Sequence, residues 1–276
     1  MRGKALWAGL FALALPLVPA AYSQIAPDTI RLDQPAAQGR YVRGWAPPNT
    51  IRLTLDGVAI PLATDGRFAI GFGRDAGPDA TLIAQMRDGE SVQQPIPVAP
   101  RRWKIENLPT LPRWPQPSAE FAARRPAELA QIEAARQQHS QSSGWRGRFI
   151  WPAKGRISGV FGSQRIYAGE PGAPHNGVDI AGGSGAPVIA PADGVIVLAA
   201  QSPFTLEGHL VMIDHGMGLS SALLHLSRID VKLGDVVTQG QPIGAIGMTG
   251  RATGPHLHWG LRLRDVRLDP AELVGE

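Results

Sequence analysis

Near the C-terminus, the segment TGPHLHWGLRL alternates between apolar and polar positions, as a half-buried β-strand does. Leu257, Trp259 and Leu261 recur at every second position and predict one face packed against a core. His256 and His258 fall on the opposite face, because successive side chains of a strand point to opposite sides. Two imidazoles held side by side can bind one metal ion, or one can hold the metal while the other transfers protons.

Residues 24–100 contain short alternating runs separated by turn signals. The dipeptides Asp56-Gly57, Asp65-Gly66 and Asp88-Gly89 stand between these runs, and Asp-Gly favours a tight β-hairpin turn. This spacing predicts a small β-sandwich, immunoglobulin-like in general shape. The segment has no cluster of acids or histidines, so we expect it to position or bind rather than to catalyse.

Residues 101–148 predict a proline-rich linker with one helix. The prolines at its start keep the chain extended and break regular structure; they are Pro109, Pro112, Pro115 and Pro117. A helix is expected at about 126–139, where Pro126 suits a first helical turn and Ala, Glu, Gln and Arg follow.

Residues 149–276 again consist of short apolar runs, now separated by many glycines and without a long helical period. They predict a compact antiparallel β-domain, so the chain belongs to the all-β class. An enzyme site in such a body is expected where polar residues from several strands converge.

Residues 1–23 have the features of an export signal. Arg2 and Lys4 precede an apolar run, and small residues allow cleavage after Ser23 or Ala20. The alternative, an uncleaved membrane anchor, is disfavoured because the run is shorter than the roughly 20 residues of a spanning helix. We therefore expect an exported protein of the periplasm or cell envelope, with no membrane span after cleavage.

Charge and cysteine content exclude several classes of function. Without Arg2 and Lys4, 25 basic residues face 23 acidic ones, a net charge of +2. No basic stripe interleaved with aromatics is present, so a nucleic-acid partner is not indicated. The absence of cysteine excludes disulfides, thiolate metal ligands and a cysteine nucleophile.

A second group of polar residues can complete a metal site with the C-terminal histidines. His175 and Asp179 bracket a glycine turn, and the apolar residues Val178 and Ile180 direct Asp179 to the opposite face of the segment. A hydrolytic zinc site needs about three ligands of imidazole or carboxylate type and an open position for water. Because no His-Glu-x-x-His motif occurs, such a site must be built from strands and loops.

The order of these motifs resembles one known family. His175-x-x-x-Asp179 is followed by Leu-His225-Leu-Ser, by the glycine-rich run over 234–244, and by the segment containing His256 and His258. Over residues 149–265 this order resembles the lysostaphin-type, or LytM-like, zinc metallopeptidases of the bacterial cell wall. The resemblance implies a LytM-type domain and hydrolysis of the peptide cross-links of peptidoglycan by metal-activated water.

Carried over position by position, the resemblance implies that Zn²⁺ is bound by His175, Asp179 and His258. It also implies that His225 and His256 are unligated catalytic histidines, one taking a proton from water and the other assisting the oxyanion or the leaving amine. The resemblance does not decide which of the two histidines has which role.

Two further positions bear on the resemblance. Leu223 stands where the family commonly has tyrosine, so a phenol that helps the reaction is either missing or supplied from elsewhere. Arg165 has a family counterpart near the cleft and is a candidate substrate-binding residue, although a plain surface arginine is an equal alternative.

Two other functions compete with the peptidase. A catalytically silent relative that binds cell wall or activates another hydrolase would usually lack one or more zinc ligands, and this chain keeps them. Residues 234–247 look like half of a biotinyl or lipoyl carrier, but Lys232 precedes the turn where such a domain carries its lysine. The sequence does not decide which bond is cleaved, D-alanyl to diaminopimelate or a glycine bridge. Residues 101–145 are expected to lie over the cleft and to limit access to it.

Overall fold

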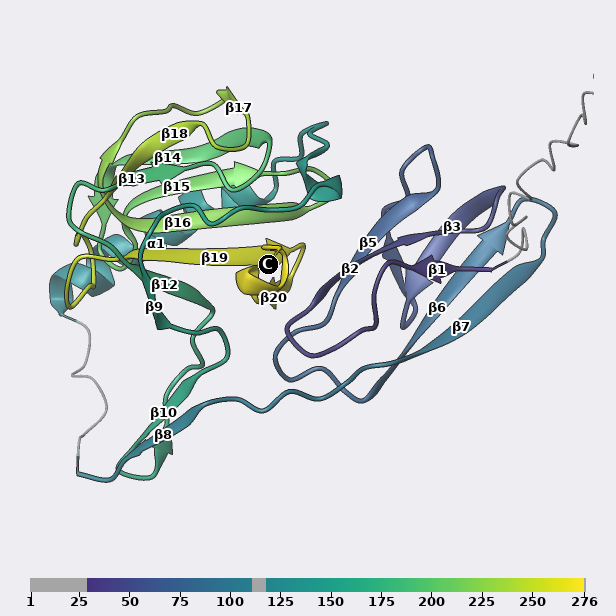
Figure 1. Ribbon diagram of the computed structural model, residues 1–276, viewed down its shortest axis with the longest axis horizontal. Coiled ribbons are helices and arrows are strands. Elements are labelled where there is room, and N and C mark those ends of the chain that lie inside the picture. Colours follow the sequence, from purple (N-terminus) through teal and green to yellow (C-terminus); the bar gives the residue numbers. More distant parts are fainter. Residues whose placement is uncertain (1–28, 111–117, 276) are drawn as a thin grey trace, which may run out of the picture.

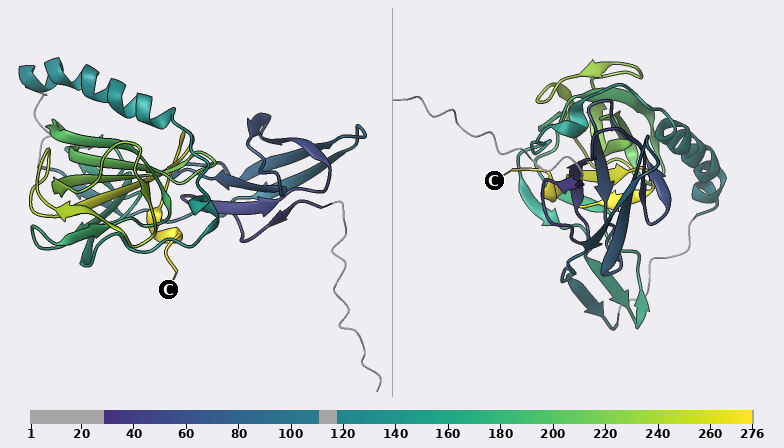
Figure 2. Two further views of the ribbon diagram at one scale, coloured as in Figure 1. Left: turned by 90° about the horizontal axis from the view of Figure 1, so that it is seen from above. Right: turned by 90° about the vertical axis from the view of Figure 1, so that its right-hand side faces the viewer.

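The chain forms two β-rich domains joined by a linker, and each domain has its own core (Figures 1 and 2). The computed structural model describes residues 29–110 and 118–275, so the export signal expected at 1–23 lies outside the described residues. In the parts that are described, no helix combines the length and apolar character needed to cross a membrane.

The N-terminal domain is the expected small sandwich of two sheets. One sheet has the order β1-β2-β5, and the other β4-β3-β6-β7. The strands are β1 (Arg31–Leu32), β2 (Tyr41–Trp45), β3 (Thr50–Leu55), β4 (Val58–Ile60), β5 (Arg67–Gly71), β6 (Asp79–Met86) and β7 (Ser91–Pro97). Asp56 and Gly57 join β3 to β4 with φ of 49° and 81°, the conformation that a tight hairpin turn requires. Phe68 and Leu82 are fully buried in the core between the sheets.

The C-terminal domain is built on one large antiparallel sheet, with the main strand order β17-β14-β15-β16-β19-β12-β9. Its strands are β9 (Arg156–Gly159), β12 (Gly177–Ala181), β13 (Pro187–Ile189), β14 (Gly194–Phe204), β15 (Gly208–Asp214), β16 (Leu219–Ile229), β17 (Val236–Val237), β18 (Pro242–Ile246), β19 (Leu257–Leu263) and β20 (Val266–Leu268). Single turns of 3-10 helix lie at η1 (Gly144–Arg146) and η2 (Pro270–Glu272). This confirms the all-β class.

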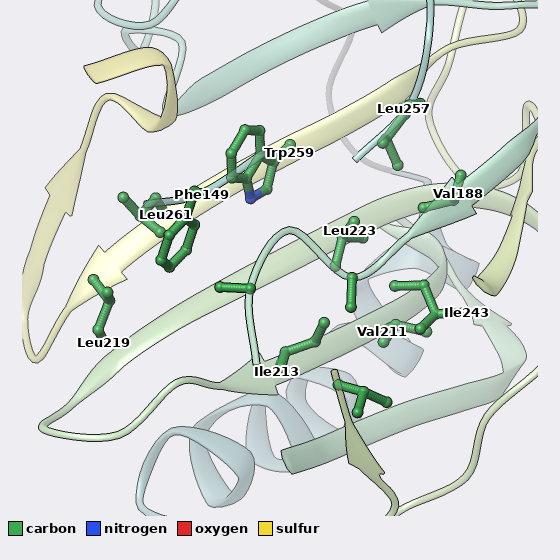
Figure 3. Packing of buried hydrophobic residues seen from close by; sticks show 14 of the residues in the cluster. Phe149, Val188, Val211, Ile213, Leu219, Leu223, Ile243, Leu257, Trp259 and Leu261 are labelled. Carbon is green, nitrogen blue, oxygen red and sulfur yellow. The ribbon is translucent and has the colours of Figure 1, made fainter. Parts of the chain in front are cut away.

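The core of the C-terminal domain fixes which way β19 faces (Figure 3). Leu257, Trp259 and Leu261 are each at most 2% exposed and pack with Phe149 and Leu223. Burying a side chain of this size stabilises the fold by about 1.5–3 kcal/mol. The apolar face predicted from the alternation is confirmed, and His258 is thereby turned away from the hydrophobic cluster.

The linker forms more structure than its prolines indicate. β8 (Ile105–Leu108) pairs in parallel with β10 (Gln164–Tyr167), which pairs with β11 (Glu170–Pro171). The expected helix is present as α1 (Ala119–Arg136), and it begins and ends earlier than the expected range of about 126–139. Ser118 caps it by accepting a hydrogen bond from the amide of Phe121, so Pro126 lies inside the helix rather than in its first turn.

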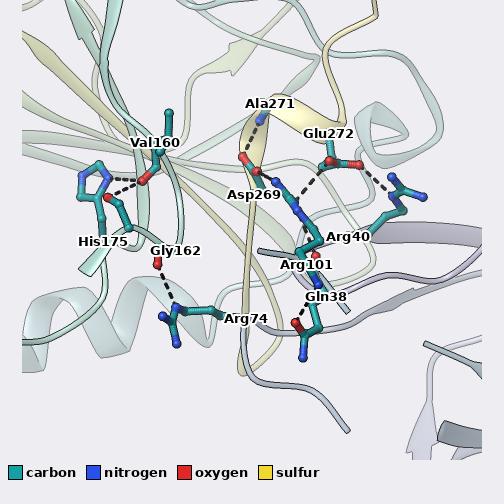
Figure 4. Close-up of polar contacts among 11 residues, drawn as sticks. Gln38, Arg40, Arg74, Arg101, Val160, Gly162, His175, Asp269, Ala271 and Glu272 are labelled. Carbon is teal, nitrogen blue, oxygen red and sulfur yellow. Dashed lines mark hydrogen bonds and ion pairs between the residues drawn. The ribbon is translucent and has the colours of Figure 1, made fainter. Parts of the chain in front are cut away.

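A polar interface joins the two domains (Figure 4). Arg101 of the linker contacts Asp269 at 2.9 Å, and Arg40 of the N-terminal domain contacts Glu272 at 2.7 Å. Tyr41 is buried among C-terminal core residues, and its hydroxyl donates to the carbonyl of Trp145 at 2.9 Å. These contacts, of which that of Tyr41 is buried, hold the sandwich in one place beside the C-terminal domain.

His215 should make the stability of this fold depend on pH. Its Nδ1 donates to the carbonyl of Asp193 and its Nε2 accepts from Ser221, and burial lowers the pKa of the ring to about 4. An unfolded histidine has a pKa of about 6.5, so only the unfolded state binds a proton between these values. The free energy of unfolding should therefore fall as the pH drops from 6.5 towards 4, by about 2 kcal/mol at pH 5.

Urea unfolding at pH 7.5 and pH 5.0 measures this loss. His215→Asn should be less stable than the wild type at pH 7.5. Between the two pH values, its free energy of unfolding should drop by about 2 kcal/mol less than that of the wild type. An unchanged pH dependence in the variant would show that His215 is not the group responsible.

Candidate metal centre and cleft

Asp179 and His258 come together because their strands are neighbours. β12 and β19 pair antiparallel with Asp179 directly opposite His258, and such partners have side chains on the same face. The carboxylate Oδ1 of Asp179 lies 2.8 Å from Nδ1 of His258. The apolar residues on either side of each, which face the core, fix this orientation.

His175 reaches the same point from the loop before β12. Its Nε2 lies 3.1 Å from Oδ1 of Asp179 and 3.1 Å from Nδ1 of His258. The three ligand atoms lie within 4.8 Å of one another. The structure therefore gathers the three residues that the resemblance implied as metal ligands.

The chemistry of these donors fits a zinc ion. Two imidazole nitrogens and one carboxylate oxygen are a common ligand set of catalytic zinc. Nδ1 of His175 donates to the carbonyl of Val160 at 3.1 Å, so Nε2 keeps its lone pair for the cluster. Nothing in the sequence pattern pointed to Val160, because the contact is made through its backbone.

The charges of the cluster also suit a cation. Burial would raise the pKa of Asp179, but its contacts with His175 and His258 outweigh burial and lower the pKa well below its usual range. Burial lowers the pKa of His258, which favours its neutral form. A carboxylate that stays ionised beside an imidazole that stays neutral is the protonation state in which both can bind metal.

His225 and His256 form a pair beside the cluster. Their ring centroids are 4.8 Å apart, and the His225 ring is 6.3 Å from that of His258. Nδ1 of His225 donates to the carbonyl of Thr249, and Nδ1 of His256 donates to the carbonyl of Gly254, at 2.9 and 2.8 Å. Both rings therefore keep Nε2 free to exchange protons.

A bulge in β16 sets the direction of His225. Val211 pairs with Leu223 and His209 with Leu226, so two residues of β16 lie opposite one residue of β15. His225 has a φ of 64°, an unfavourable value for a residue with a side chain, and its amide donates to the carbonyl of Glu207. The motif Leu-His-Leu-Ser gives no sign of this backbone conformation.

The cluster lies at one side of a cleft of about 700 Å³. Arg165 lines this cleft, and its Nε donates to Glu106 at 2.9 Å. Glu106 and Lys104 come from the linker at β8, so two parts of the chain that are far apart in sequence form the same wall. These linker residues were missed, because a parallel pairing across such a separation leaves no local signal.

The structure changes the interpretation of Leu223, which stands where the family commonly has tyrosine. Its side chain is fully buried and lies opposite Trp259 in the core, so position 223 does not face the cleft. A phenol is therefore not missing from the site through this substitution. His209 and His215 lie outside the cluster and bond to the backbone carbonyls of Ala200 and Asp193, which is a structural role.

The N-terminal domain contacts the loop that supports His175 (Figure 4). Arg74 donates from Nε to the carbonyl of Gly162 at 2.9 Å, and the amide of Gly162 donates to the carbonyl of His175 at 2.8 Å. Gly162 has a φ of 76°, and a Cβ there would stand 2.2 Å from the ring of Trp103 in the linker. The linker and the N-terminal sandwich thus hold in place the loop that orients His175.

Gly162→Ala is expected to weaken zinc binding by about 10- to 100-fold, the effect usual when an outer partner of a metal ligand is displaced. The added methyl must move either Trp103 or the loop that holds His175. Competition with a chromophoric chelator measures the affinity. Gly169→Ala is the matched control, since Gly169 also has a positive φ but a Cβ there would meet nothing within 4 Å. Equal zinc affinity of the two variants would contradict the prediction.

Comparisons with known proteins agree with this geometry. Residues 173–270 match Peptidase family M23, a range that contains all five of the gathered residues. A crystal structure from Pseudomonas aeruginosa, described as a peptidase M23, is 27% identical and superposes with a TM-score of 0.66. The superposition covers 88% of this chain and 96% of the chain from Pseudomonas aeruginosa, so the fold similarity extends to both domains.

Curated relatives match a little under half of the chain. The peptidoglycan DD-endopeptidase ShyA of Vibrio cholerae is 44% identical over 118 residues, which are 42% of this chain and 27% of ShyA. The cell division protein DipM of Caulobacter vibrioides is 35% identical over 129 residues, 47% of this chain and 20% of DipM. The match thus spans about a quarter of the length of these relatives. Through the domain that gathers His175, Asp179 and His258, the chain belongs to peptidase family M23.

Proposed function

We propose that this protein is an exported, zinc-dependent endopeptidase that hydrolyses the peptide cross-links of peptidoglycan. The observation that carries the proposal is the cluster of His175, Asp179 and His258 beside the pair His225 and His256, at the side of an open cleft. Membership in family M23 and the similarity to a peptidoglycan DD-endopeptidase support the reaction and the substrate class.

His175, Asp179 and His258 would hold Zn²⁺, which supplies Lewis acidity towards the scissile carbonyl and lowers the pKa of water. The remaining chemistry is proton transfer by this chain's own residues. Burial lowers the pKa of His225 to about 4, so its Nε2 is unprotonated at neutral pH and can accept a proton. The second imidazole, His256, lies close enough to share the task, so one ring can serve the attacking water and the other the leaving amine.

Binding of cell wall without catalysis is the less favoured function. A protein that only binds would not need two further histidines whose Nδ1 atoms are both occupied by carbonyls, with Nε2 left for proton exchange. The linker borders the cleft through β8, whereas α1 packs on β14. Limited access to the cleft through residues 101–145 stays a prediction.

Turbidity of isolated cell walls tests the proposal. The purified protein should clear the walls, a chelator should stop the clearing, and added Zn²⁺ should restore it. Clearing that continues in excess chelator would contradict a metal-dependent reaction.

A further inference from the structure

A second, smaller groove of about 110 Å³ lies between α1 and the sheet, next to the candidate metal centre. Ile132 and Arg136 of α1 form one wall, and most of the other lining residues come from β16 and β19. His258, Gly260 and Arg262 alternate along β19, so all three face the groove. Four residues of strand span roughly 13 Å, which is therefore the distance from the His258 end of the groove to Arg262.

Arginines gather at the end of the groove away from His258. Arg262 and Arg267 are direct cross-strand partners on β19 and β20, and like charges in this position destabilise a sheet. Arg136 reaches the same place from α1, and its Nε is buried without a hydrogen-bond partner. Burial, followed by the charges of Arg262 and Arg267, lowers the pKa of Arg136. A fold that places three guanidinium groups together gains stability when an anion joins them.

The acids nearby do not neutralise this cluster. Asp265 accepts from Nη2 of Arg262 at 2.8 Å, but its side chain is fully exposed. Glu133 lies 3.4 Å from Nη1 of Arg136 and is also exposed, and exposed pairs of this kind contribute little. Among the residues that the structure describes, no carboxylate contacts Arg267.

Glu207, the remaining acid of the groove, is already engaged. Arg125 of α1 donates to both of its carboxylate oxygens, at 2.6 and 2.8 Å. The groove thus has a neutralised carboxylate, and it has an excess of N–H donors at the end away from His258.

We propose that Arg136, Arg262 and Arg267 form a subsite for a carboxylate of the peptide substrate. The proposal rests on the proposed function, because it places the scissile bond at the candidate metal centre. An extended peptide advances about 3.3–3.6 Å per residue, so the carboxylate belongs to a residue about four positions from that bond. Guanidinium groups bind carboxylates through paired hydrogen bonds, which gives the subsite selectivity for charge and for position.

The subsite bears on which cross-link is cleaved. A stem peptide with free carboxylates can satisfy the cluster, whereas a glycine bridge offers only backbone groups. Basic side chains also line the cleft that contains His175 and Asp179, among them Lys104, Arg156 and Arg251. The groove therefore favours a carboxylate-bearing stem over a neutral bridge.

The experiment compares two synthetic cross-linked peptides that differ only in a free carboxylate or a carboxamide about four residues from the cleaved bond. The wild type should have a KM about tenfold lower for the carboxylate form, the effect expected from a charged hydrogen bond. Arg267→Gln should lose this preference with kcat unchanged; Arg267 is exposed, so the variant is expected to fold. Arg87→Gln, which removes the same charge from an exposed turn of the N-terminal domain, should behave as the wild type.

A binding measurement separates this proposal from the proposed function. Calorimetric titration of the zinc-loaded protein with a short acidic peptide that has no scissile bond should show about tenfold weaker binding to Arg267→Gln. That result supports the subsite even if neither cross-linked peptide is hydrolysed, an outcome that would reject the peptidase alone. Equal affinities for the wild type and Arg267→Gln, or binding of inorganic phosphate but not of the acidic peptide, would overturn the subsite.

Discussion

Replacing His256 with alanine should slow the hydrolysis of cell walls by about 10²- to 10⁴-fold while the protein keeps its zinc. The ring lies beside the cluster, with Nε2 3.9 Å from Oδ1 of Asp179, but it is not among the three grouped ligand atoms. Its loss removes a proton carrier and leaves the metal-binding residues in place. The rate of clearing and the zinc content of the same preparation measure the two effects together.

His139→Ala is the matched control for this variant. His139 is exposed after the end of α1, away from the cluster, so its loss should leave both rate and zinc content unchanged. A His256→Ala protein that clears walls at the wild-type rate would remove this histidine from the mechanism. One that loses its zinc would instead make His256 a metal ligand.

Asp179→Asn should lose zinc and activity together. The amide has nearly the shape of the carboxylate, but it brings no negative charge and offers a weaker ligand oxygen to the cation. Loss of the Asp179 carboxylate should lower the zinc affinity by more than the 10- to 100-fold that outer partners of a metal ligand contribute. The reason is that Asp179 contacts both His175 and His258. Metal analysis after dialysis and chelator competition give the affinity.

Asp230→Asn provides the comparison for that result. Asp230 forms an ion pair with Arg228 away from the cleft, so the same chemical change there should leave zinc binding intact. If the Asp179→Asn variant kept one zinc per chain at wild-type affinity, the cluster would not be the metal site.

The alternation of residues was sufficient to predict the parts of the fold that depend on neighbours along the chain. Leu257, Trp259 and Leu261 face the core as expected, and His256 and His258 lie on the side of Asp179. The Asp56-Gly57 turn joins β3 to β4 for the same reason, since a hairpin is specified by its own turn residues.

Features that depend on distant partners could not be predicted in this way. β8 forms only because β10 offers it an edge, and the residues between give no sign of that pairing. The bulge at His225 depends on the register of β16 against β15. The arginine cluster needs α1 to bring Arg136 over β19 and β20, a packing that no local pattern specifies.

Mass spectrometry of the fragments released from defined, cross-linked peptidoglycan tests the central claim most directly. The zinc-loaded protein should convert cross-linked dimers into monomers, with one new carboxylate and one new amine for each bond cut and with the glycan strands intact. His256→Ala should release no such monomers over the same time. Cleavage confined to the glycan, or no cleavage by protein that carries one zinc per chain, would contradict the account.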